Sequence, residues 1–153
     1  MAVGYTARMD VRAILNGGFD RSLGGLDVFD IGTGRVQARL VVGESVQNFF
    51  GKLHGGAIAT LVDDIGTFAV MTADHYQRPG VTTDLHVSYL AAADAGDSVL
   101  VEAEVLSCGL SLAFVEVTLR RDPRGDVIAR GQMTKLLGNV PASRPAPAAR
   151  AGP

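Results

Sequence analysis

The chain has 153 residues, 47% hydrophobic and 20% charged, which predicts one soluble globular domain. The formal net charge of −2 gives no basis for nucleic-acid binding, and the single cysteine, Cys108, excludes a disulfide framework and a cysteine-based zinc site. No apolar stretch reaches the roughly 18 residues of a membrane span, and the N-terminus lacks a signal-peptide pattern, so we expect a cytoplasmic or organelle-matrix protein without a membrane span.

A β-hairpin is predicted in the N-terminal third of the chain. A short helix could come first, over residues 9–15. Apolar and polar residues alternate over 35–42, as in a half-buried strand. The glycine-rich turn at 32–34 joins this segment to a second strand candidate at 26–31, which is the usual arrangement of a hairpin.

One long helix is predicted over 56–73, because its apolar residues recur at helical spacing and form one wide stripe. The stripe consists of Ile58, Leu61, Val62, Ile65, Phe68 and Ala69. The segments after the helix are typical of β-strands, and the Pro-Arg-Gly turn before the last of them is a strong reversal signal. The four strand candidates are 81–90, 98–106, 113–120 and 127–136.

These elements predict the fold class. An antiparallel sheet with one apolar face must be covered, and the long helix is the only element large enough to cover it. We therefore expect an α+β hotdog fold, in which a curved antiparallel sheet wraps around one long central helix. The domain would span 1–138, with its core at about 10–138, and the Pro- and Ala-rich segment 139–153 would be a disordered tail.

The segment N-F-F-G-K-L-H-G-G leads directly into the long helix. Backbone N–H groups at a helix start are unpaired, so the N–H of Gly55 or Gly56 could bind a developing oxyanion. A glycine turn that only reverses the chain is the alternative. His54 could contact a substrate or only orient the loop, and Asn48 could position a water, bind a carbonyl group or belong to an ordinary turn.

Asp63 is the candidate catalytic acid of the helix. A face of small residues lets a substrate or a partner subunit approach closely, and a carboxylate shielded there needs a partner or a function. Asp63 could therefore activate a water beside the oxyanion site. An exposed acid without function is one alternative, and Asp64, about 100° around the helix, is another. The small neighbours at helical spacing are Gly56, Ala59, Gly66 and Thr67.

Together these segments resemble the PaaI-like hotdog-fold thioesterases. They are most similar to the THEM-type acyl-CoA thioesterases, the subgroup that contains acyl-coenzyme A thioesterase thirteen. The resemblance covers about 10–138, through the motifs GFDRSLG, N-x-x-G-x-LHGG, ATLVDDIGT, PGVTTDLHVSYL, SLAF and ARGQMTKLLG. It implies hydrolysis of an acyl-CoA to a carboxylic acid and coenzyme A, without a metal or a separate cofactor. It also implies a homodimer with its site at the subunit interface, and commonly a dimer-of-dimers tetramer.

The resemblance implies a role for each catalytic candidate. Asp63 would act as general base or orient the attacking water, and Gly55 would supply the oxyanion-hole N–H. Asn48 of the partner subunit would help place the nucleophile or the thioester. The hydroxyl of Thr82 would help to hold the water, and His54 would lie near the carbonyl and the leaving sulfur. From the residues alone, Thr82 could donate to the water or have only a structural role in its strand.

Further residues are predicted to contact the substrate. Arg120 and Lys135 could bind the phosphates of coenzyme A at the rim, or be solvated surface cations. Phe49 and Phe50 are plausible walls of an acyl pocket, with a plain core role as the alternative. The adjacent acids of the helix raise the chance that one carboxyl has an elevated pKa. The predicted substrate-binding residues are Gly56, Thr67, Phe49, Phe50, Arg120 and Lys135.

Three other functions remain open. The substrate could be an acyl or polyketide chain on acyl-carrier protein. Hydration or dehydration of an acyl-CoA is a second possibility, although the helix lacks the histidine on which such hotdog enzymes generally rely. A non-catalytic acyl-binding protein is the third, and an Asp63 paired with Arg or Lys without an open pocket would favour it. The acyl group, fatty or aromatic, and the choice between general-base and anhydride routes also stay open.

Overall fold

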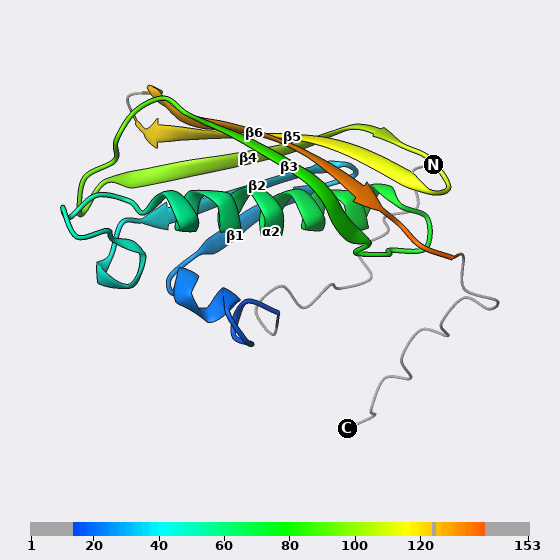
Figure 1. The fold of residues 1–153 in the computed structure, drawn as a ribbon, viewed down its shortest axis with the longest axis horizontal. Coiled ribbons are helices and arrows are strands. Elements are labelled where there is room, and N and C mark those ends of the chain that lie inside the picture. The colour runs from blue at the N-terminus through cyan, green and yellow to red at the C-terminus, as the bar shows by residue number, and fades with distance from the viewer. Residues whose placement is uncertain (1–13, 124, 140–153) are drawn as a thin grey trace.

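The computed structural model describes residues 14–123 and 125–139 (Figure 1). A six-stranded antiparallel sheet curves around one long helix, α2 (Gly55–Ala73), which confirms the hotdog architecture. Most of the helix predicted at 9–15 and nearly all of the tail predicted at 139–153 lie outside the described residues. The strands are β1 (Asp27–Gly32), β2 (Arg35–Val41), β3 (Val81–Tyr89), β4 (Ser98–Cys108), β5 (Leu112–Asp122) and β6 (Val127–Leu136). Two short 3-10 helices, η1 (Asp20–Leu23) and η2 (Glu44–Val46), were not predicted.

The strand order differs from a simple run of four consecutive strands after the helix. The order across the sheet is β1-β2-β4-β5-β6-β3, so β3 pairs with β6 and not with the next strand in sequence. Alternation of side chains predicts which face of a strand is buried but not which strand lies beside it, and the pattern therefore missed this crossover. As a result β3 is an edge strand, and no other described segment of the chain pairs with its second side.

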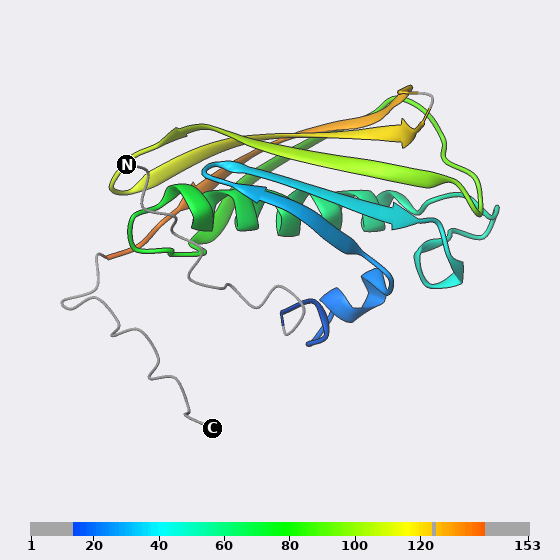
Figure 2. The same ribbon diagram turned by 180° about the vertical axis from the view of Figure 1, so that it is seen from behind.

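The helix α2 lies across the concave side of the sheet (Figures 1 and 2). Two glycines allow it to approach the strands closely. A Cβ on Gly131 of β6 would lie 2.4 Å from Cγ1 of Val62, and a Cβ on Gly66 would lie 2.6 Å from Cε of Met133. Gly66 is therefore packed against the sheet, and its predicted place on an open face was wrong. The close approach brings the neighbouring polar positions of α2 within reach of β3 and β6. All six residues of the predicted apolar stripe are buried.

α2 has the length and composition of a membrane-spanning helix, with a mean hydropathy of 1.3 over its most apolar window. The central helix of a globular domain has the same properties, and here the apolar stripe is buried against the sheet. Length and composition are therefore weak evidence for a membrane span.

Candidate active site

The start of α2 leaves one glycine N–H available. His54 is the N-cap, and its Nδ1 accepts a hydrogen bond of 2.8 Å from the N–H of Gly56, so the proton of a neutral ring lies on Nε2. Within the described residues no acceptor meets the N–H of Gly55. The hydroxyl of Tyr89 donates to the carbonyl oxygen of Gly55 over 3.1 Å and fixes the helix start against the end of β3. The oxyanion candidate is thus Gly55 and not Gly56.

The capping role of His54 can be tested by stability. His54→Ala is expected to lower the free energy of unfolding by about 1 kcal/mol, because the N–H of Gly56 loses its acceptor. His54→Asn should retain most of the stability, since asparagine caps helices well. Urea unfolding of the two variants and the wild type measures the difference, and an alanine variant as stable as the wild type would contradict the cap.

Asp63 belongs to a cluster of four polar side chains from α2, β3 and β6. The hydroxyl of Thr82 lies 2.6 Å from Oδ1 of Asp63, which is a short, charge-assisted hydrogen bond. Nζ of Lys135 donates to the hydroxyls of Thr82 and Thr67, each over 2.9 Å, and lies 4.0 Å from Oδ1 of Asp63. The Asp63 side chain is 43% exposed, so the cluster opens to the outside through its carboxylate.

Lys135 is only 4% exposed, and the structure therefore locates it inside this cluster and not at a rim. Burial lowers the pKa of Lys135, and the carboxylates of Asp63 and Asp64 oppose that shift. The sequence does contain a signal for this buried position. Side chains alternate between the two faces of a strand, and Lys135 therefore lies on the same inward face of β6 as Gly131 and Met133.

Asp64 has the elevated pKa expected of one acid in the pair. Burial raises the pKa of Asp64 from 3.8 to about 7; the charges of Asp20 and Asp63 add to the shift, and Lys135 opposes it. Its buried Oδ2 has no hydrogen-bond partner within the described residues. Asp20 lies on η1, which no sequence pattern had connected with the helix.

The pKa of Asp64 predicts how stability changes with pH. Because this pKa is higher in the folded protein than in the unfolded chain, the folded state binds more protons between about pH 4 and 7, and stability falls as pH rises through that window. The Asp64→Asn variant has no buried carboxyl group that can ionise at this position. The stability of the variant relative to wild type should therefore increase from pH 5 to pH 8. Thermal unfolding at both pH values measures this, and parallel pH dependences of the two proteins would contradict it.

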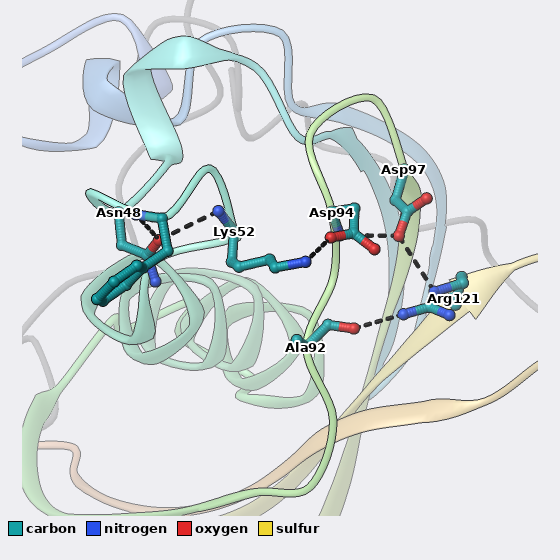
Figure 3. A network of polar contacts seen from close by, with 7 residues as sticks. Asn48, Lys52, Ala92, Asp94, Asp97 and Arg121 are labelled. Carbon is teal, nitrogen blue, oxygen red and sulfur yellow. Dashed lines mark hydrogen bonds and ion pairs between the residues drawn. The ribbon is translucent and has the colours of Figure 1, made fainter.

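The loop before α2 is held firmly by its own polar groups (Figure 3). Oδ1 of Asn48 accepts hydrogen bonds from the N–H groups of Phe50 (2.9 Å) and Lys52 (3.1 Å). Lys52 forms an ion pair with Asp94, which extends the contacts to the connection between β3 and β4. The oxygen of Asn48 is thus occupied within the loop, and its NH2 group is the part that can donate to a substrate.

The same contacts continue to β5 and show how rigidly the loop is anchored (Figure 3). The N–H of Asp94 donates to Oδ2 of Asp97 over 2.9 Å, and Nε of Arg121 lies 3.2 Å from that oxygen. Arg121 also donates to the carbonyl oxygen of Ala92. A loop fixed in this way presents its side chains in a defined position.

Phe49 and Phe50 project from the loop and are 97% and 79% exposed. Their rings meet edge to face, with centroids 5.6 Å apart. The alternative of a plain core role is therefore wrong for both. Exposed, ordered aromatic side chains on an anchored loop are typical of a surface that contacts a ligand or another subunit.

Arg120 lies away from the Asp63 cluster. It is on the outer face of β5, next to the buried Leu119 that faces the helix, and its Nε lies 3.2 Å from Oε2 of Glu102. It helps to line a shallow hollow of about 250 Å³ on that outer face. The structure thus does not bring Arg120 together with Asp63, and a phosphate contact of Arg120 stays a prediction.

Gly55 and Asp63 are too far apart along one helix to act on the same carbonyl group. They are eight positions apart, which corresponds to about 12 Å of helix rise. Reacting atoms must approach to about 3–3.5 Å. Within one chain the helix start and Asp63 therefore do not lie beside each other.

Comparison with known proteins agrees with this fold and these motifs. A family model described as Thioesterase superfamily matches residues 50–128. Human acyl-coenzyme A thioesterase 13 is 39% identical over 121 residues, which are 79% of this chain and 86% of that protein. The crystal structure of zebrafish thioesterase superfamily member 2 is 41% identical with a TM-score of 0.81, and the match covers 84% of this chain and 93% of that one. The PaaI protein of E. coli, 18% identical with a TM-score of 0.72 over 84% of this chain and 91% of that one, shares the fold.

Proposed function

Since the chain belongs to the thioesterase superfamily, we propose that Asp63 activates the water in its hydrolysis of acyl-CoA thioesters to a carboxylic acid and coenzyme A. The chain is a thioester hydrolase, because its relatives over four-fifths of its length are acyl-coenzyme A thioesterases. The observation that carries the assignment to Asp63 is its partly exposed carboxylate, held at one oxygen by Thr82. The other oxygen can then take a proton from water.

In this proposal the thioester carbonyl binds at the N–H of Gly55. The N-terminus of a helix carries a partial positive charge, and an unpaired N–H there stabilises an oxyanion. The charge develops on the carbonyl oxygen as water attacks, and collapse of the tetrahedral intermediate releases the thiolate of coenzyme A. Every group used belongs to the chain or to the substrate, so the mechanism requires no cofactor.

A homodimer that pairs through the β3 edges would overcome the separation of Gly55 and Asp63 along one helix. Gly55 is tied to the Tyr89 end of β3, and Asp63 is tied to Thr82 at the other end. If two β3 edges pair antiparallel about a two-fold axis, the Tyr89 end of one strand lies opposite the Thr82 end of its partner. Gly55 of one subunit would then meet Asp63 of the partner subunit. Each dimer would have two such composite sites, and a tetramer would combine two dimers.

The anchored loop supports a role at the same interface. Phe49 and Phe50 would form part of the acyl pocket, and the NH2 group of Asn48 would hold the thioester or the water. His54 and Gly56 would lie beside the bound carbonyl as the cap of the helix start. Thr67 would contribute indirectly, by accepting a hydrogen bond from Lys135. Assembly into tetramers and a cytoplasmic location stay predictions.

Release of free thiol from acyl-CoAs tests the proposal directly. The purified protein would be assayed with acyl groups from acetyl to palmitoyl, together with phenylacetyl and hydroxybenzoyl esters, beside Asp63→Asn. Turnover that the variant loses supports the proposal and identifies the preferred acyl group. Turnover of acyl-carrier-protein esters alone would instead favour the carrier-bound substrate, and no turnover of either would favour a binding protein.

A further inference from the structure

We propose that Lys135 is a positioning residue, which fixes the direction of the Thr82 hydroxyl and so holds Asp63 with one carboxylate oxygen free for the attacking water. This inference rests on the proposed function and deepens it. It also replaces the phosphate-binding role that the sequence predicted for Lys135.

The direction of the Thr82 proton follows from the chemistry of its partners. A lysine ammonium group has three donors and no acceptor, so Thr82 must accept from Lys135 over the 2.9 Å contact. The single proton of the hydroxyl then points to Oδ1 of Asp63, 2.6 Å away. Thr82 consequently has no proton left to donate to water, and it acts on the reaction through Asp63.

The remaining acceptors suit a nucleophilic water. Within the described residues no hydrogen bond reaches Oδ2 of Asp63, and Thr82 retains one lone pair. A water that donates one proton to each of these acceptors keeps its own lone pairs for the thioester carbon. One of the two protons then passes to Asp63 as the carbon–oxygen bond forms, and the carbon–sulfur bond breaks in the following step.

The position of Lys135 is held by a second hydroxyl and by charge. Thr67 on α2 accepts from Nζ over 2.9 Å, so the ammonium group bridges the helix and β3. The titratable groups that face it are Asp63, 4.0 Å away, and Asp64, both on α2. Burial lowers the pKa of Lys135, and these carboxylates oppose that shift by favouring the charged form of the lysine.

A phosphate group has little access to Lys135. The side chain is 94% shielded from solvent, and two of its three donors are occupied by threonine hydroxyls. A phosphate would have to displace these hydroxyls and enter beside Asp63, which like charges oppose. The burial and the contacts together favour positioning over substrate binding.

Lys135→Met tests the proposal with two substrates, since methionine keeps much of the volume and removes the charge and donors. One substrate is an acyl-CoA, and the other is the same acyl group on N-acetylcysteamine, which lacks the phosphates of coenzyme A. Positioning predicts that kcat falls at least about tenfold with both substrates while KM changes little. A raised KM for acyl-CoA alone, with the short substrate unaffected, would overturn the proposal.

A double variant separates this inference from the proposed function and from a merely structural role. In an Asp63→Asn background, Lys135→Met should reduce the residual turnover little further, because Lys135 acts through Asp63. A second loss as large as the first would contradict that dependence. Full activity of Asp63→Asn alone would instead refute the proposed function. If Lys135→Met does not fold, Lys135→Leu, which also lacks the charge and the donors, serves for the same measurements.

Discussion

Replacement of Asp63 with asparagine is expected to lower kcat for acyl-CoA hydrolysis by about 10²–10⁴-fold, the contribution of a positioned general base. Asparagine has nearly the same shape, and its side-chain oxygen can still accept the hydrogen bond from Thr82. It cannot take a proton from water at neutral pH. Stability should change little, because the Asp63 side chain is 43% exposed. Initial rates of thiol release, with unfolding curves for the variant and wild type, measure both effects.

The next residue supplies a matched control. Asp64→Asn makes the same chemical change one position along the helix, at a carboxyl whose raised pKa and burial reflect packing and not contact with Thr82. We expect this variant to retain turnover within about tenfold of wild type. If instead Asp64→Asn abolishes turnover and Asp63→Asn does not, Asp64 is the catalytic acid.

The secondary structure could be predicted closely because local patterns determine it. The helical stripe of α2 and the alternation in β2 and β6 are properties of consecutive residues, and their predicted boundaries fall within two residues of those observed. The neighbour of β3 could not be predicted, since it depends on which strand edges meet after the chain has crossed the helix. The same local patterns also say little about η1, whose Asp20 reaches Asp64 only through the tertiary fold.

The candidate site could likewise be predicted only in part from the sequence. The hydrogen bond between Asp63 and Thr82 brings together two residues to which the family resemblance assigned roles. The position of Lys135 between them depends on how closely α2 approaches β6, which Gly66 and Gly131 allow. Whether Gly55 and Asp63 share a site depends on the assembly, because the rise of the helix separates them within one chain.

Gly55→Pro is expected to lower kcat by about 10²–10³-fold, because proline has no N–H to stabilise the oxyanion. Gly55 is the first residue of α2, the helix position that tolerates proline best, and His54 before it has the extended conformation that a following proline requires (φ −66°, ψ 136°). The fold should therefore persist. Rates of thiol release and circular dichroism of the variant check the two expectations.

Gly55→Ala is the control for the added side chain. A Cβ at this position lies 3.4 Å from Cε1 of Tyr89, a tight contact that both substitutions introduce. Only proline removes the N–H. Alanine should accordingly retain most of the turnover, and an equal loss in both variants would assign the effect to the contact with Tyr89 and not to the hydrogen-bond donor.

Mixing the two inactive variants shows whether the donor and the acid come from different subunits. In a heterodimer of Asp63→Asn and Gly55→Pro chains, composite sites leave one site with both groups intact and one with neither. Random pairing of equal amounts should then recover about a quarter of wild-type activity, as expected for two sites related by two-fold symmetry. If each site were built within one chain, every site would keep one defect and mixing would recover nothing. Recovered activity from two separately inactive chains would therefore support both residues and a site that two subunits share.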